Sequence, residues 1–224
     1  ATPTIAAQFP ADRTVLVRNF PRLEEFAAAR GRPAGGQRGR THDIVYVGGL
    51  TEQRGAREML DALARLPATP APRLVLVGDF WPPELGRALA KHPGWTRVEW
   101  RGFQTREGVA AALSTARVGL ALLHPTPEYR VSYPVKLFEY MAAGLPVVAS
   151  DFPLWREFVH DTGAGLLVDP LNPLAIAQAI ERLLTNPAEA EAMGSRGAAA
   201  VRAQYAWEPE GEKLVRFYAK LEAR

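Results

Sequence analysis

The chain of 224 residues contains no cysteine, and this absence excludes a disulfide scaffold, a thiolate metal site and a cysteine nucleophile. No apolar run approaches the ~18 residues of a membrane span, and residues 1–10 lack the pattern of a signal peptide. Charge of one sign is never concentrated, since 27 Lys and Arg face 24 Asp and Glu without a block of like charges. We therefore expect a cytoplasmic protein that does not bind nucleic acid.

Several catalytic and cofactor motifs are also missing. The sequence has no Walker phosphate loop, no Gly-x-Gly-x-x-Gly after a strand and no Gly-x-Ser-x-Gly elbow. Its four histidines are scattered without metal-ligand spacing, and there is no Asp-x-Asp. These absences argue against a nicotinamide dinucleotide site, an α/β-hydrolase and a metal site, and they predict a protein with no resident cofactor.

What is present is a regular alternation of apolar runs and helical patterns from residue 44 onward. Each of the first runs ends in glycine and leads into a helix; the expected strands are residues 44–47, 74–77, 98–100, 118–123, 147–149 and 165–168. Continuous apolar strands of this kind predict an α/β fold, a Rossmann-like parallel sheet with helices on both faces. Ligands of such sheets bind beyond the carboxyl ends of the strands, which places candidate contacts in residues 48–55, 78–83, 101–105 and 124–136.

The first 40 residues have a different character. A short apolar run at residues 15–17 predicts a strand, and residues 21–30 predict a helix. Residues 31–40 hold four Gly and three Arg, which is typical of a solvated linker. At the other end, a helix with apolar positions is expected over residues 210–221.

The most informative stretch is residues 132–151, a loop, a short helix that begins at Pro134, a glycine stop at Gly144 and a buried strand. Pro134 has no N–H, so the free donors at the helix start are those of Val135 and Lys136, and such an end suits a phosphate. The Lys136 side chain adds a charge, and Glu139 one turn later could accept hydrogen bonds from a ribose diol. A plain surface pair of Lys136 and Glu139 is the alternative, worth only a few tenths of a kcal/mol.

This stretch resembles the donor-binding segment of group 1 glycosyltransferases, a retaining family with the GT-B fold. The family carries Glu, seven residues and a second Glu, and the second half of that motif matches EYMAAGLPVVA at residues 139–149. Further likenesses in the same order are VGG at 47–49, RG at 54–55, GF at 102–103, GLLVDP at 165–170 and YAW at 205–207. The resemblance covers nearly the whole chain and implies the C-terminal, nucleotide-sugar-binding half of the fold.

The resemblance implies a role for each matching residue. Glu139 would hold the ribose, the N–H groups of Val135 and Lys136 the distal phosphate, and Arg54 the diphosphate, for which a guanidinium fork is suited. Phe103, with the backbone of Gly102 and Gln104, would flank the base. The nucleotide site is completed by Gly49, Tyr133 and Pro134. Two alternatives stay open: Phe103 as a core aromatic and Arg54 as a solvated arginine.

Two positions depart from the family pattern. Val131 stands where the first Glu of the motif belongs, so recognition of the donor sugar must differ here or be weaker. Gly49 stands where a second diphosphate-binding arginine belongs, and Lys136 could compensate for it. The resemblance therefore gives no catalytic residue on this chain; catalytic groups are expected on an N-terminal domain.

The implied organisation is a remnant of that N-terminal domain with an interdomain linker at 1–40, the donor domain at 41–205, and a helix at 206–224 that would pack back on the absent domain. The implied function is binding of a UDP- or GDP-linked sugar for transfer to a saccharide or lipid-linked acceptor, without turnover by this chain alone. A lipid-linked acceptor would bring the protein to the inner membrane face. The alternatives are a non-catalytic nucleotide-binding module, or partner subunit of a split transferase, and a different GT-B enzyme such as a nucleotide-sugar epimerase.

Overall fold

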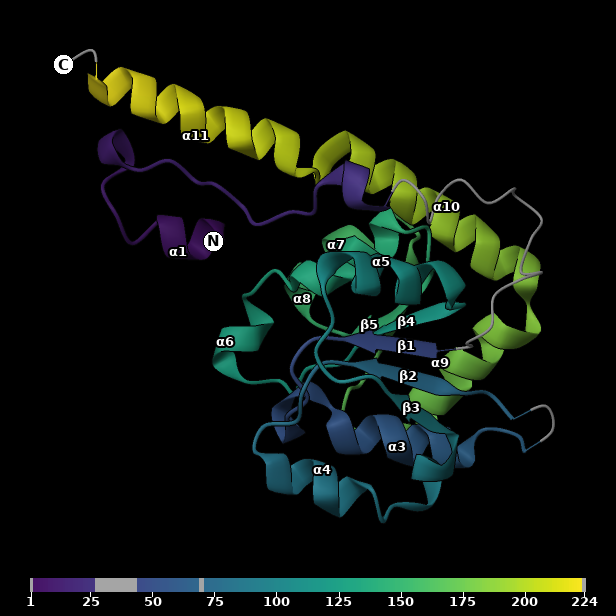
Figure 1. Cartoon of the computed structure of the whole chain (residues 1–224). Helices are drawn as coiled ribbons and strands as arrows, with labels where there is room; N and C mark the ends of the chain where they lie inside the picture. The colour runs from purple at the N-terminus through teal and green to yellow at the C-terminus, as the bar shows by residue number, and fades with distance from the viewer. Residues whose placement is uncertain (1, 27–43, 69–70, 223–224) are drawn as a thin grey trace.

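The computed structural model describes residues 2–26, 44–68 and 71–222, so the expected linker at 31–40 lies outside the described residues. Six parallel strands form one sheet in the order β3-β2-β1-β4-β5-β6 (Figure 1). Their bounds are β1 Ile44–Val47, β2 Leu74–Val77, β3 Val98–Trp100, β4 Val118–Ala121, β5 Val147–Ser150 and β6 Gly165–Val168. The order reverses between β1 and β4, which confirms the predicted Rossmann-like sheet and places the switch point at these two strands.

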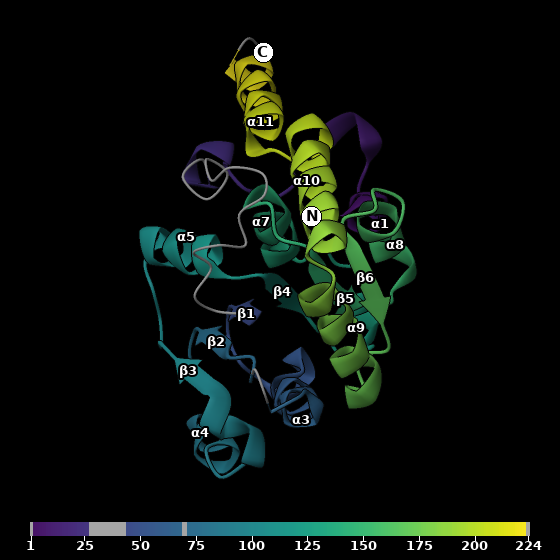
Figure 2. The same ribbon diagram turned by 90° about the vertical axis from the view of Figure 1, so that its right-hand side faces the viewer.

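Helices cover both faces of the sheet (Figures 1 and 2). One face carries α5 (Arg106–Thr115), α7 (Val135–Ala142) and α8 (Pro153–Val159), and the other carries α3 (Ala56–Arg65), α4 (Pro83–Leu89) and α9 (Pro173–Thr185). Within β1 the side chains alternate between the two cores, with Val45 and Val47 in the first and Ile44 and Tyr46 in the second. Because both faces are covered, every residue of β1 is buried, and the apolar run reads as continuous.

Glycines end β1 and β2 because the backbones there approach closely. Gly48 and Gly78 have φ of 118° and 133°, a region that L side chains rarely adopt. The Gly48 N–H donates to the carbonyl of Val77 at 2.8 Å, and the Gly78 N–H donates to the carbonyl of Gly102 at 2.8 Å. A Cβ on Gly78 would collide with the backbone of Gly48. At the carboxyl edge of the sheet, the backbone segments that follow β1, β2 and β3 therefore contact one another directly.

The remaining elements are short, apart from the last two helices. The short ones are α1 (Pro3–Ala6), α6 (Pro127–Arg130) and the 3₁₀ turns η1 (Ala11–Arg13), η2 (Leu23–Phe26), η3 (Glu52–Arg54) and η4 (Pro93–Arg97). Helix α10 (Pro187–Gln204) packs against α7 and α9, and α11 (Trp207–Glu222) extends away from the sheet (Figure 1). The sequence did not predict α10, whereas α11 begins three residues before the expected start.

The predicted strand at residues 15–17 is wrong. Residues 14–22 form no strand, because none of the described strands pairs with them and a lone strand has no hydrogen-bond ladder. Of the helix expected at 21–30, the described part is only the turn η2, and residues 27–30 lie outside the described ranges.

Residues 14–22 are instead held by α11. The Glu210 carboxylate, 2% exposed, accepts from the Arg18 backbone N–H at 2.9 Å, from the Arg18 guanidinium at 2.9 and 3.1 Å, and from Lys213 Nζ at 2.6 Å. Burial raises the pKa of Glu210, but the bonds from Lys213 and Arg18 outweigh it and hold the pKa below its usual value. Phe20 then packs edge-on against Phe138 of α7, with ring centroids 4.9 Å apart.

The Glu210 junction gives a first prediction. Glu210→Gln keeps the shape but removes the charge, and we expect it to weaken the docking of α11 on residues 14–22 by about 2 kcal/mol. Hydrogen exchange of the α11 amides should speed up roughly 30-fold. In the wild type the same docking should be lost as the pH falls through the lowered pKa of Glu210, because protonation of the carboxylate removes its ion pairs.

Glu212→Gln is the matched control, since the Glu212 side chain is 69% exposed and its one ion pair within the described ranges is with Arg216 one turn away. Equal exchange rates in the two variants would show that Glu210 does not hold the junction.

Candidate functional site at the start of helix α7

The position of α7 on the sheet is fixed by Tyr140. Its buried hydroxyl accepts a hydrogen bond from the Val47 N–H of β1 at 2.8 Å. Its ring lies over Gly119 of β4, where a Cβ would come within 2.6 Å of the ring carbons. Since α7 starts above β1 and β4, its first turn lies at the switch point of the sheet, where Rossmann-like folds bind their ligands.

A cavity of about 440 Å³ opens at this start of α7. Six of the predicted site residues line it: Arg54, Tyr133, Pro134, Val135, Lys136 and Glu139. It is completed by Val47, Gly48, Arg106, Leu123, Tyr129 and Ser132. Gly48, Tyr129 and Ser132 fall within the residue ranges that the strand ends predicted, although none was given a role, and the other three lie outside those ranges. Pro134 is the N-cap residue and α7 begins at Val135, one residue later than expected. The N–H groups of Val135 and Lys136 therefore belong to the first turn, which lacks intrahelical acceptors.

Lys136 is the least satisfied charge of the described residues that line this cavity. Its Nζ is buried and finds no hydrogen-bond acceptor in the described part of the chain. It lies 3.7 Å from the centre of the Tyr46 ring, a cation–π contact, and close to Gly48. Burial and the nearby Arg54 lower the pKa of Lys136 well below its usual value, while Glu139 opposes the shift. An anion in the cavity would supply the missing partner.

Arg54 is the second cation. Its guanidinium donates to the Gly49 carbonyl at 3.4 Å, and Nη1 would lie 3.1 Å from a Cβ on Gly49. Burial lowers the pKa of Arg54, but the Tyr129 and Tyr46 hydroxyls outweigh it, so the pKa is raised. The half-buried side chain is held at the cavity wall, which does not agree with a freely solvated arginine. Gly49 does not line the cavity, but it contacts Arg54, which does.

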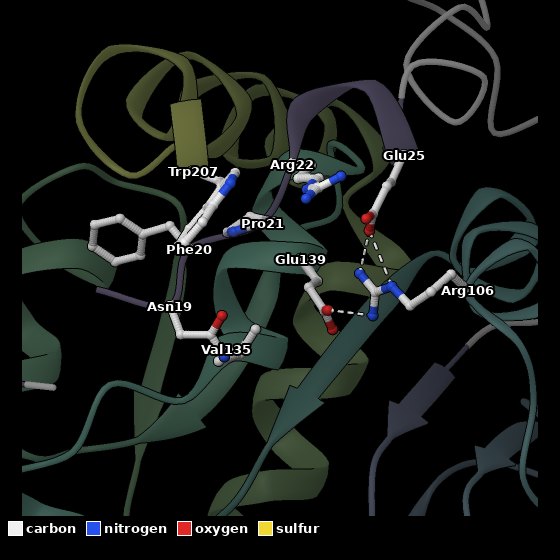
Figure 3. A pocket seen from close by; sticks show the side chains of 9 residues that line it. All are labelled: Asn19, Phe20, Pro21, Arg22, Glu25, Arg106, Val135, Glu139 and Trp207. Atoms are coloured by element: carbon white, nitrogen blue, oxygen red, sulfur yellow. Dashed lines mark hydrogen bonds and ion pairs between the residues drawn. The ribbon is translucent and has the colours of Figure 1, made fainter. Parts of the chain in front are cut away.

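Glu139 forms the far side of the cavity and is only 5% exposed. Its Oε1 accepts from Arg106 Nη1 at 2.7 Å. The Lys136 Nζ atom and the Glu139 side chain are both buried, so the alternative of a plain surface pair is wrong. Glu139 and Arg106 also line a neighbouring cavity of about 310 Å³. Figure 3 shows both side chains with the other residues that line this cavity, which include residues 19–22, Glu25 and Trp207.

The three residues predicted near the base do not line this cavity. Phe103 is 78% exposed, so the alternative of a core aromatic is also wrong. Gly102 accepts from the Gly78 N–H and lies near Asp79, and the Gln104 amide donates to the Arg101 carbonyl at 2.8 Å. These residues precede α5, whose first residue, Arg106, reaches the cavity. The rule that ligands bind beyond the carboxyl ends of the strands predicted contacts at residues 101–105, and Arg106 is the next residue.

Metal ligands and membrane spans are both missing from the described residues. These residues contain no group of three His, Cys, Asp or Glu side chains that could hold a metal ion. None of the helices described here is both long and apolar enough to cross a membrane.

Comparison with known proteins defines the class. The family model described as "Glycosyl transferases group 1" matches residues 41–186, which is more than half of the chain. The phosphatidyl-myo-inositol mannosyltransferase of Mycobacterium leprae is 39% identical over 181 residues, covering 78% of this chain and 46% of the relative. The chain belongs to the group 1 glycosyltransferases, and it spans about half the length of the curated relatives it matches.

Solved structures agree on the fold. The Anabaena protein HepE, solved in complex with UDP, superposes with a TM-score of 0.75 at 18% identity, covering 96% of this chain and 60% of HepE. The C-terminal domain of a group 1 family protein, LpcC of Francisella tularensis, superposes with a TM-score of 0.63 at 17% identity, covering 86% of this chain and 96% of that domain. The sheet with its helices therefore has the architecture of a GT-B glycosyltransferase domain.

The buried ammonium gives a second prediction. Lys136→Met removes an unpaired buried charge, and we expect the free energy of unfolding to rise by about 1–2 kcal/mol near pH 7. In the wild type, the unfolded chain binds more protons than the folded one between the lowered pKa of Lys136 and its ordinary value of about 10.4. Stability must therefore rise with pH across that window, and the Lys136→Met variant should lack this rise.

Denaturant titrations from pH 7 to 10 measure both effects. Lys91→Met is the control, because Lys91 is exposed just after the end of α4 and should leave the pH slope unchanged. If Lys136→Met is less stable than the wild type, or keeps the wild-type slope, Lys136 is already satisfied in the free protein.

Proposed function

We propose that the chain is the donor domain of a group 1 glycosyltransferase, and that the cavity at the start of α7 binds the diphosphate and ribose of a UDP- or GDP-linked sugar. One observation carries the proposal. The Lys136 ammonium, with no acceptor among the described residues, shares one cavity with Arg54, the first turn of α7 and the buried Glu139.

The cationic side of the cavity suits a diphosphate. Lys136 supplies a point charge, Arg54 a planar fork, and the N–H groups of Val135 and Lys136 a helix N-terminus, the three devices by which proteins bind phosphate. These cations could neutralise a diphosphate without a metal ion. Gly49 carries no side chain. Lys136 must therefore supply more of the positive charge that neutralises a diphosphate than in family members with an arginine at this position.

Glu139 suits a ribose at the other side of the cavity. Arg106 occupies Oε1, and Oε2 has no hydrogen-bond donor among residues 2–26, 44–68 and 71–222, so it is free to accept from a hydroxyl. The exposed ring of Phe103, with the backbone of Gly102 and Gln104, would meet the base at the edge of the site. The UDP complex of HepE is consistent with a uridine nucleotide, while the identity of the base for this chain is part of the proposal.

The acceptor would be bound by a second domain, in the same chain or in trans. Helix α11 exposes an apolar stripe in which Val215, Tyr218 and Leu221 are 69%, 58% and 48% exposed. Such a stripe needs a partner surface. Since the curated relatives are about twice as long as the matched region, we propose that the partner is an acceptor-binding N-terminal domain. A saccharide or a lipid-linked acceptor both fit this arrangement, and the latter would place the cytoplasmic protein at the inner membrane face.

Calorimetry with UDP, GDP and ADP tests the donor site. We expect at least one of them to bind, and Glu139→Gln to weaken that binding about 10- to 100-fold, because an amide is a poorer acceptor for ribose hydroxyls than a carboxylate. Glu181→Gln, an exposed glutamate of α9, is the control and should bind as the wild type does. Absence of binding, or binding insensitive to Glu139→Gln, contradicts the proposal.

The proposed location of the catalytic groups on a second domain gives a separate prediction. Incubated with UDP-glucose or GDP-mannose, this chain should release no free nucleotide above the uncatalysed background, because the groups next to the reacting carbon are expected on the acceptor domain. Chromatographic assay of UDP and GDP measures this. Turnover by the chain alone would place the catalytic groups on it, and binding without turnover after an acceptor domain is restored would favour a non-catalytic nucleotide-binding module.

A further inference from the structure

Arg106 joins three parts of the chain that are far apart in sequence. It is the first residue of α5, and its guanidinium reaches Glu139 of α7 and Glu25 of η2 (Figure 3). Nη1 donates to Glu139 Oε1 at 2.7 Å, while Nε and Nη2 donate to Glu25 Oε2 at 3.0 and 2.5 Å. The guanidinium also lies 5.7 Å from the ring centre of Phe26. All three kinds of guanidinium nitrogen are therefore used.

The hydrogen bonds of Arg106 are divided unequally between Glu25 and Glu139. Glu25 takes two of the three bonds, so Arg106 is held by Glu25 and by its place at the start of α5. Burial lowers the pKa of Arg106, but Glu25 and Glu139 outweigh it, so the pKa is raised and the cation persists. Glu139 receives a single bond on Oε1, which fixes the rotation of its carboxylate and leaves Oε2 as the free acceptor.

A buried carboxylate needs such a partner before a ligand arrives. Glu139 is 5% exposed and lies one turn from Lys136, yet Lys136 Nζ makes no hydrogen bond to it. Without Arg106, the carboxylate would be desolvated and free to rotate toward the Lys136 ammonium. A ribose would then have to compete with that internal ion pair for both oxygens.

We propose that Arg106 is a positioning residue of the donor site: by holding Oε1 of Glu139, it presents Oε2 to the ribose hydroxyls, and Glu25 in turn holds Arg106, so that η2 takes part in ribose recognition through Glu25. This inference rests on the proposed function, because it assumes that Glu139 binds ribose. It adds a residue and a segment that neither the sequence motif nor the strand ends pointed to.

The test compares each nucleotide with its analogue lacking the ribose hydroxyls. Arg106→Ala, Arg106→Lys, Glu25→Gln and the control Glu24→Gln are titrated by calorimetry with UDP, GDP and ADP and with their 2′,3′-dideoxy forms. Glu24 is exposed and adjacent to Glu25, so its substitution matches the charge change without touching Arg106.

We expect Arg106→Ala to weaken binding of the ribonucleotide about 5- to 20-fold, the scale of one hydrogen bond, and binding of the dideoxy form less than about twofold. Arg106→Lys should recover part of the loss, since a lysine can donate to Glu139 but cannot hold Glu25 and Glu139 with one planar fork. Glu25→Gln should show a smaller loss with the same dependence on the hydroxyls, and Glu24→Gln none.

The possible results distinguish a failure of this inference from a failure of the proposed function. An equal loss for the ribonucleotide and the dideoxy form would show that Arg106 acts on the phosphates or on the fold, and it would overturn the inference while the donor site stands. Wild-type protein that binds none of the nucleotides would overturn the proposed function and this inference with it. A circular dichroism melt of each variant identifies any that fails to fold, in which case Arg106→Lys and Glu25→Gln decide the question.

Discussion

The packing of Tyr140 on the sheet is the constraint on which the site depends. Its ring fits over β4 only because Gly119 has no side chain, and its hydroxyl accepts the Val47 N–H at the last residue of β1. Burial keeps the pKa of Tyr140 well above its usual value, so the hydroxyl stays neutral. With α7 fixed there, Lys136 and Glu139, four and one residues earlier on the helix, must lie at the carboxyl edge of the sheet.

That position has an energetic consequence. Without a bound anion, the charges at the start of α7 reduce the stability of the fold in two ways. Lys136 and Arg54 repel each other, and the Lys136 ammonium has no hydrogen-bond partner among the described residues. Binding of a diphosphate, as proposed, would relieve both costs at once. On this proposal, the same residues lower the stability of the free protein and raise its affinity for an anion, a common compromise at functional sites. On the other side of the cavity, Arg106 pairs with Glu139 and so lowers the free-energy cost of burying that carboxylate.

Most of the sheet and half of the residues that line the cavity could be predicted from the sequence, since both depend on local patterns. The strands read as apolar runs ended by glycine, and the start of α7 is marked by Pro134 and Lys136. Helix α10 could not be found in this way because its buried face consists largely of small residues: Gly194 lies against the backbone of Gly144, and Gly197 would place a Cβ 3.2 Å from Met141 Cγ. Such a face has no periodicity of large apolar side chains.

Arg106 was missed for a different reason. Its partners are 81 and 33 residues away, and no local pattern connects a helix-start arginine with Glu25 or Glu139. The strand expected at residues 15–17 failed because pairing, and not the apolar run itself, makes a strand. Likewise, the sequence could place Phe103 near a ligand or in the core, and only its exposure excludes the core.

Backbone amide NMR with UDP, or with GDP or ADP where those bind instead, tests most directly whether the start of α7 is the nucleotide site. We expect the largest chemical-shift changes on titration at Gly48, Val135, Lys136 and Glu139, with smaller ones at residues 102–106. Changes centred elsewhere, such as around α4 and Trp95, with those amides unmoved, would contradict it.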